Sequence, residues 1–254
     1  MKKITYTSLA LINLLAPLTN THAAVALDRT RIIYNEGDKA VSLNVSNQNK
    51  ELPYLAQGWI ENEKGEKITT PFTVLPPIQR IEPGESSQLR VQALPAANGL
   101  AKDRESVFYF NLREIPPRSD QPNTLQIALQ TRVKLFYRPK TLIVEQPHLS
   151  TPWQNKLVLE RQGERYTAYN PTGYYITLVE AARRKGEQGI NEFDPVMVAP
   201  KSRSVLNVTA TKLGNTPVIT YIDDYGGRPT LQFQCKDNNC TTVEGTKSNS
   251  EKKK

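Results

Sequence analysis

Alternating apolar and polar residues are the dominant pattern in this chain. Val41, Leu43 and Val45 alternate with polar neighbours, which is the period expected of a strand with one buried face. The same period predicts strands at about 54–62, 87–93 and 107–113. Turn signals rich in Gly and Pro, such as Glu82-Pro83-Gly84-Glu85, separate these segments. Short strands at this spacing favour an antiparallel β-sandwich.

A second group of strands follows an interruption near Tyr137. Pro139 comes soon after, and proline cannot continue a central sheet ladder. Alternation then resumes in five segments: 156–159, 174–179, 205–208, 218–221 and 230–234. We find no helical pattern longer than about three turns and no internal repeat. The pattern therefore predicts two all-β units, residues 24–140 and 141–245, with a polar, basic tail at 246–254.

Composition supports a folded chain and narrows its class. Hydrophobic residues make up 38% of the 254 positions and charged residues 23%, as in ordinary globular domains. The 18 prolines, about 7%, exceed the roughly 5% average and fit a strand-rich chain with many turns. Two cysteines are too few for a disulfide-dense miniprotein or a four-cysteine zinc site.

The first 23 residues have the features of a secretory signal peptide. Two lysines precede the apolar run 9–16, and Thr21 and Ala23 occupy the −3 and −1 positions of a break before Ala24. The run is far shorter than the roughly 20 apolar residues of a spanning helix, so no membrane span is predicted. Without this leader 31 basic residues face 25 acidic ones, a net charge of +6.

Export also predicts the state of the two cysteines. Cys235 and Cys240 would reach an oxidising compartment, where a disulfide between them is expected. The bond closes a short loop, so its entropic contribution to stability should be about 2 kcal/mol.

Catalytic and metal-binding signatures are absent from the sequence. His148 is the sole histidine after the leader, which excludes a two-histidine metal site, and no nucleophile elbow or phosphate-binding loop occurs. Asp223 and Asp224 would point to opposite faces of a strand, which argues against a catalytic carboxylate pair. The residues therefore predict no enzyme, no cofactor and no bound metal. The basic residues are distributed along the whole chain. Their net charge of +6 therefore indicates solubility or anionic partners, and not nucleic acid, which an exported protein rarely meets.

Four segments, taken together, resemble the periplasmic pilus chaperone family. They are AVALDRTR at 24–31, DRESVFYFNLREIPP at 103–117, LQIALQTRVKLFYRP at 125–139 and YIDDYGGRP at 221–229. The resemblance covers residues 24 to about 240. It implies two immunoglobulin-like β-sandwich domains arranged in an L with an interdomain cleft. It further implies a periplasmic protein that binds pilus subunits and delivers them to an outer-membrane usher without ATP.

The row Leu125, Ile127 and Leu129 has two interpretations. On pattern alone, one face of an ordinary strand fills its own core, because Val133 and Leu135 continue the same parity. The resemblance implies instead that the row belongs to a strand that the chain donates to a subunit lacking its own final strand, a mode called donor-strand complementation. An incomplete sandwich exposes apolar interior and unpaired edges, and such a strand would cover both.

Further site residues follow from the same resemblance. It implies that Arg31 and Lys134 bind the terminal carboxylate of the subunit, and that Glu105, Arg138 and Asp224 form an interdomain ion-pair network. Two convergent cations suit a carboxylate because charge-assisted hydrogen bonds contribute roughly 1.5–3 kcal/mol each.

The relation of the anchor to the apolar row stays open in the sequence. Lys134 has the opposite parity to Leu125, Ile127 and Leu129, so either a bulge or bend intervenes or the cleft is reached from the other side of the sheet.

An exported structural pilin or adhesin is the alternative function. Such a protein should have one domain and an apolar extension before its sandwich, whereas residues 24–31 enter a strand pattern at once. The sequence leaves open which subunits and usher are served, what the basic tail does, and whether the chain associates with itself when no subunit is bound.

Overall fold

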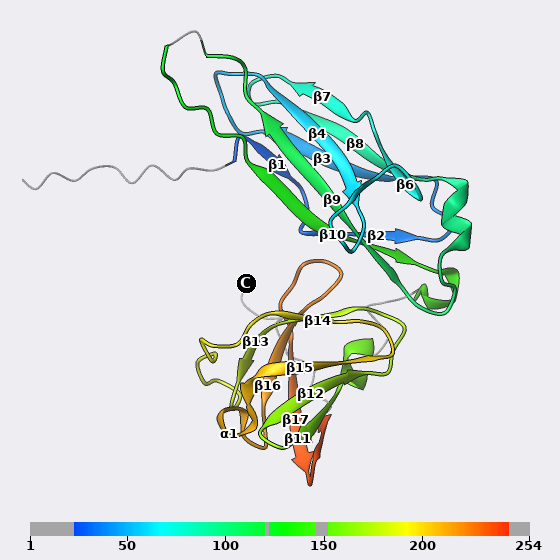
Figure 1. The fold of residues 1–254 in the computed structure, drawn as a ribbon, viewed down its shortest axis with the longest axis vertical. Coiled ribbons are helices and arrows are strands. Elements are labelled where there is room, and N and C mark those ends of the chain that lie inside the picture. The colour runs from blue at the N-terminus through cyan, green and yellow to red at the C-terminus, as the bar shows by residue number, and fades with distance from the viewer. Residues whose placement is uncertain (1–22, 120–121, 146–151, 244–254) are drawn as a thin grey trace, which may run out of the picture.

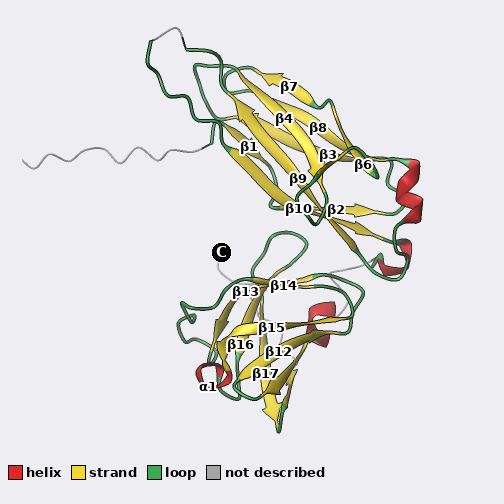
Figure 2. Cartoon of the chain, in the orientation of Figure 1, coloured by secondary structure: helices red, strands yellow, loops and turns green. Residues whose placement is uncertain are grey.

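The computed structural model describes residues 23–119, 122–145 and 152–243. Its strands form two units, the upper and lower parts of Figure 1, and short helices occupy little of the chain (Figure 2). Three parts of the sequence analysis lie outside the described residues: the predicted leader apart from its last residue, Ala23; His148; and the tail 246–254. Within the described ranges no helix is long and apolar enough to cross a membrane. The all-β prediction is confirmed.

The N-terminal unit is a sandwich of two sheets. One sheet has the order β1-β3-β8-β6 and the other β2-β10-β9-β4-β5, with β7 paired to β4. Pairing is antiparallel except between β2 and β10, which run parallel. The inward faces of both sheets bury one core that includes Tyr34, Phe72, Phe110 and Leu135. The strands are β1 (Val25–Leu27), β2 (Arg31–Asn35), β3 (Val41–Asn47), β4 (Tyr54–Glu61), β5 (Lys67–Ile68), β6 (Phe72–Leu75), β7 (Ile78–Ile81), β8 (Ser86–Ala93), β9 (Ser106–Ile115) and β10 (Gln130–Arg138).

The C-terminal unit has a core of its own. Its described strands join in the order β14-β13-β16-β17-β18-β11-β12-β15, around Leu159, Tyr166, Leu206 and Phe233. These strands are β11 (Val158–Gln162), β12 (Arg165–Asn170), β13 (Ile176–Ala182), β14 (Val196–Val198), β15 (Ser202–Thr209), β16 (Val218–Ile222), β17 (Thr230–Lys236) and β18 (Asn239–Thr242). The short helices of the described chain are η1 (Pro95–Gly99), η2 (Lys140–Leu142), η3 (Trp153–Lys156) and α1 (Ala210–Leu213).

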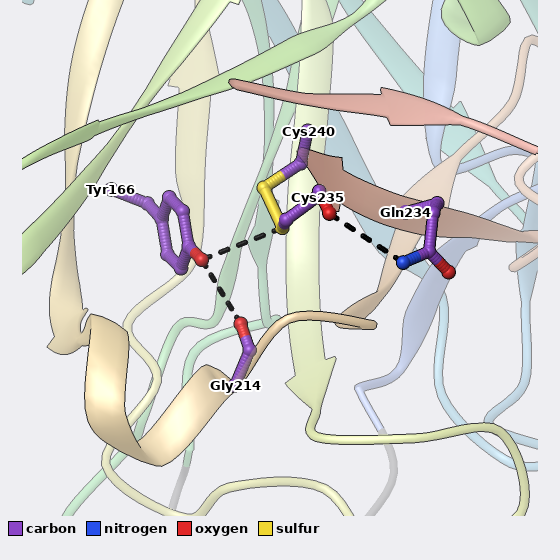
Figure 3. Close-up of a disulfide and its surroundings, with 5 residues drawn as sticks. All are labelled: Tyr166, Gly214, Gln234, Cys235 and Cys240. Atoms are coloured by element: carbon purple, nitrogen blue, oxygen red, sulfur yellow. Dashed lines mark hydrogen bonds between the residues drawn. A yellow bond between two sulfur atoms is a disulfide. The ribbon is translucent and has the colours of Figure 1, made fainter. Parts of the chain in front are cut away.

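The disulfide lies in the hairpin of β17 and β18. Cys235 and Cys240 are directly opposite each other in the strand register and are bonded, as predicted (Figure 3). The bond therefore cross-links β17 and β18 at a position where their backbones already pair. Tyr166 approaches Cys235 Sγ at 3.4 Å and donates a hydrogen bond to the carbonyl of Gly214 at 3.0 Å.

Several sequence-based expectations need correction. Lys156 belongs to η3 and not to a strand, and β11 begins at Val158. β12 was missed; its consecutive residues Tyr166, Thr167 and Ala168 are all buried, so buried and exposed positions do not alternate along it. Asp223 and Asp224 lie in the turn after β16 and not on a strand. There Asp223 accepts hydrogen bonds from the backbone N–H groups of Tyr225 and Gly227.

The apolar row Leu125, Ile127 and Leu129 is not part of a strand in this structure. β10 begins one residue later, at Gln130, whose register partner on β9 is Arg113. β9 ends at Ile115, and the last backbone contact is the Glu114 N–H donated to the Leu129 carbonyl at 3.0 Å. Strand geometry needs a hydrogen-bonded neighbour, and past this point the described chain offers none.

Candidate functional site

Arg31 and Lys134 are neighbours on two parallel strands. Arg31 begins β2, and its register partner on β10 is Lys134. Register partners project from the same face of a sheet, so both side chains leave the N-terminal unit together. Arg31 Nη1 donates to the Ile222 carbonyl at 3.1 Å, and Lys134 Nζ lies 3.4 Å from Thr177 Oγ1. Both acceptors belong to the C-terminal unit, so the two cations lie where the units meet.

The electrostatic environment of this pair favours an anion. Burial, and then the neighbouring Arg31, lowers the pKa of Lys134 below its ordinary value. Burial also lowers the pKa of Arg31, although Asp224 and Asp223 oppose that change. Arg31 Nε is buried and has no hydrogen-bond partner among the described residues. Two partly desolvated cations with an unused donor would be stabilised by a carboxylate between them.

The structure also settles the parity of β10. Its register with β9 continues without a shift from Gln130 to Tyr137, so β10 itself has no bulge against β9, and the row 125–129 lies before the strand begins. Val133 and Leu135 point into the core, and Lys134 therefore points out of the opposite face toward the C-terminal unit. The cleft is reached from the other side of the sheet, which was one of the two alternatives left open by the sequence.

Leu125, Ile127 and Leu129 are exposed to solvent. Their exposed fractions are 84%, 66% and 44%, whereas Leu135 on the same row is fully buried. Three large apolar side chains in succession on a surface are unusual and mark an interaction site more often than chance exposure. In Figure 1 their segment belongs to the green loop that leaves the sandwich at its upper left.

The start of β10 also has an open edge. β2 pairs with β10 only from Lys134 onward, so among the described strands nothing pairs with Thr131–Val133 on the side away from β9. A groove runs between this edge and β1, lined in part by Val25, Leu27 and Val133. An open edge is a template for pairing with another chain.

Glu114 is a site residue that the sequence analysis missed. It is 5% exposed, and its Oε2 accepts the Val25 N–H at 2.9 Å while Oε1 accepts the Leu129 N–H at 3.3 Å. One carboxylate thereby fixes β1 and the base of the exposed segment. The signal in the sequence was a lone acid within the apolar run of β9, but its partners are far away in the chain.

Glu105, Arg138 and Asp224 come together as an ion-pair network. Arg138 contacts Glu105 and Asp224, each at 2.7 Å. Glu105 is 3% exposed and also accepts the backbone N–H of Tyr175 at 2.8 Å. Burial alone would lower the pKa of Arg138, but the carboxylates of Asp224 and Glu105 hold it above its ordinary value. Because Glu105 and Arg138 belong to the N-terminal unit and Asp224 to the other, the network ties the units together.

Family models match both units of the chain. Residues 24–143 match the N-terminal domain of PapD, described as a pili and flagellar-assembly chaperone, and residues 152–233 match the C-terminal domain of the pili assembly chaperone PapD. Two relatives from Escherichia coli are similar over most of their length. The probable fimbrial chaperone YfcS of strain K12 is 51% identical over 87% of each chain. The chaperone protein PapD is 46% identical over 88% of this chain and 92% of its own.

Solved structures of chaperones share the fold. The periplasmic chaperone SfaE has a TM-score of 0.64 and 33% identity, over 82% of this chain and 98% of its own. The complex of the Salmonella enterica SafA pilin with the SafB chaperone has a TM-score of 0.69 at 24% identity, over 85% and 98%. The second likeness concerns the fold alone.

Proposed function

The chain belongs to the family of pilus-assembly chaperones, and from this premise we propose that Leu125, Ile127 and Leu129 fill a groove in an incomplete pilus subunit. The exposure of these three side chains is the observation that carries the proposal. A soluble chain exposes such a row at the cost of unfavourable hydration, and burial in a partner recovers about 25 cal/mol for each Å² of apolar surface. The alternative, a structural pilin or adhesin, is not favoured, because the relatives are chaperones.

The backbone around the row supports strand addition as the binding mode. Among the described strands none pairs with residues 125–128, and the adjoining Thr131–Val133 offer an open edge. A subunit strand laid along this edge would gain main-chain hydrogen bonds, and its groove would accept alternate apolar side chains. Ordering of 125–129 into a strand would then accompany binding.

Arg31 and Lys134 supply the anchor in this proposal. The terminal carboxylate of the subunit would join the two cations and use the free Arg31 Nε. Since the pair points out of the face opposite the core, the anchor would set the register along the open edge without occupying the apolar groove. The network of Glu105, Arg138 and Asp224 would hold the cleft at a fixed angle.

The wider assignment rests on the family. We propose that the protein works in the periplasm after removal of residues 1–23, hands subunits to an outer-membrane usher, and has no enzymatic activity or cofactor. Residues 24–140 and 141–245 would be its two domains, and 246–254 a basic tail. Intact mass of the periplasmic protein tests the leader, because it should begin at Ala24.

Coexpression with pilus subunits tests the central proposal. We expect a one-to-one complex with a smaller protein in periplasmic extract, and no copy of this chain in sheared surface fibres. A variant with Leu125, Ile127 and Leu129 all replaced by Ser should fold but fail to retain subunits. Recovery of this chain in the fibres themselves would instead show a structural pilin. Copurification of the complex with a tagged usher tests delivery.

A further inference from the structure

A second group of cations lies on the C-terminal unit, away from the interdomain cleft. Arg161 near the end of β11 and the pair Arg183–Arg184 directly after β13 line one pocket of about 420 Å³. The rest of its lining comes from α1 and the segment after it, including Thr211, Asn215 and Thr216. No acidic residue is among the described residues that line it. We name this site the distal arginine pocket. α1, which marks it, lies at the lower left of Figure 1, far from the N-terminal unit.

A backbone hydrogen bond positions Arg161, and the side chain of Arg183 lies beside Gly214. Arg161 Nε donates to the Gly163 carbonyl at 3.2 Å. Arg183 lies across Gly214, where an added Cβ would be 3.3 Å from both its Cγ and its Nε. Gly214 has a φ of +70°, which other residues rarely adopt, and its carbonyl is fixed by the Tyr166 hydroxyl (Figure 3). The absence of a side chain at Gly214 therefore leaves space for Arg183.

The arginines of the pocket differ from others of this unit in their ion pairing. None of the three arginines forms an ion pair with any residue in the described part of the chain. Arg203 of the same unit, by contrast, pairs with Glu160 at 2.9 Å. Cations that line one pocket repel one another, and an anion bound among them would relieve this repulsion. A guanidinium presents a planar fork of donors that matches phosphate oxygens, and the threonine and asparagine side chains add neutral hydrogen-bonding groups.

We propose that the distal arginine pocket binds the phosphate group of a phosphorylated ligand. A soluble phosphate compound and a phospholipid headgroup present the same chemistry to these residues. The site is separate from Arg31 and Lys134, so the proposal is independent of subunit capture.

Two probes used in parallel test this pocket and distinguish the two sources. Pyrophosphate is titrated into the mature chain by calorimetry at low salt, and vesicles of phosphatidylglycerol or phosphatidylcholine are used in cosedimentation. We expect saturable binding of pyrophosphate, of phosphatidylglycerol vesicles or of both, weakened at least tenfold by Arg184→Ala and by Arg183→Ala. An effect confined to pyrophosphate identifies a soluble ligand, and one confined to phosphatidylglycerol identifies a headgroup.

Arg90→Ala is the matched control. Arg90 is an exposed arginine on β8 of the other unit, and its loss removes the same charge. Binding should stay within twofold of wild type in this variant. Arg184→Ala keeps the test valid if Arg183→Ala disturbs the Gly214 turn. The proposal is overturned if neither probe binds, or if Arg90→Ala weakens binding as much as Arg184→Ala, since net charge alone would then explain the attraction.

Discussion

The apolar row on one face of residues 125–137 has two halves that differ in environment. The core half, Val133, Leu135 and Tyr137, is buried in the sandwich of the N-terminal unit, whereas the outer half, Leu125, Ile127 and Leu129, is exposed. Both halves have the same alternation and similar side chains. The difference arises because the core half faces the second sheet, whereas Leu125 and Ile127 lie past Leu129, where the last backbone hydrogen bond to β9 is made. Alternation therefore identifies an apolar face but not what covers it.

Placing the same charge in each half gives the largest expected effect. Leu135→Asp would bury an unpaired carboxylate in a fully dry core, a penalty comparable with a whole domain stability of about 5–15 kcal/mol. We expect that variant not to fold. Ile127→Asp should keep a urea midpoint near wild type, because its side chain stays in water. A strongly lowered urea midpoint for Ile127→Asp would show instead that the outer half is part of the protein's own core.

The second prediction concerns what the outer half binds. Ile127→Asp should lose retention of pilus subunits, because its carboxylate would be desolvated in an apolar groove at a cost of several kcal/mol. Copurification from periplasmic extract measures the loss, and Ile127→Val is the control that should still retain subunits. Normal retention by the Asp variant would show that residue 127 does not enter the subunit.

Anchor variants test the opposite face of β10. Arg31→Ala and Lys134→Ala should each weaken subunit binding by about 2–5 kcal/mol, as expected for loss of one partner in a partly desolvated charge contact. Folding should persist, because removing one of two adjacent cations relieves repulsion. Subunit affinity and the urea midpoint, measured on the same variants, check both parts. Wild-type affinity in either variant would exclude the carboxylate anchor.

The lowered pKa of Lys134 predicts a pH dependence of the anchor. Subunit binding needs the charged ammonium, so affinity should fall as pH rises through this lowered pKa, before free lysines titrate. The loss should reach about tenfold, or about 1.4 kcal/mol, for one charged contact. Lys134→Arg should remain flat over the same alkaline range, since arginine stays charged. Identical profiles for the two proteins would argue against titration of Lys134.

The smallest expected effects are the losses of stability when single residues of the outer half are replaced by Ala. Leu129→Ala, at a position 44% exposed, should reduce the free energy of unfolding by up to about 1 kcal/mol, and Leu125→Ala, at 84%, by less than about 0.5 kcal/mol. Urea denaturation of the free protein resolves this order. A larger loss for Leu125→Ala than for Leu129→Ala would contradict the gradient of burial along the outer half.

Local chemistry made the fold class predictable. Strands such as β4 and β8 are visible because side chains alternate with a period of two, and Gly and Pro mark the turns between them. The disulfide joins residues with only four others between them, so sequence proximity and export were enough to predict it. The resemblance to a family, and not alternation, selected Arg31 with Lys134 and Arg138 with Asp224.

The sequence by itself determined two all-β units, the approximate positions of their longer strands and the cysteine pairing, because these depend on residues close together in the chain. Tertiary structure alone decided which half of the apolar row is covered, on which face Lys134 lies, and that Glu114 fixes both β1 and Leu129. The physical reason is that burial and charge pairing depend on what packs opposite a side chain. For these residues the opposing groups come from strands distant in sequence, whose arrangement no local pattern records.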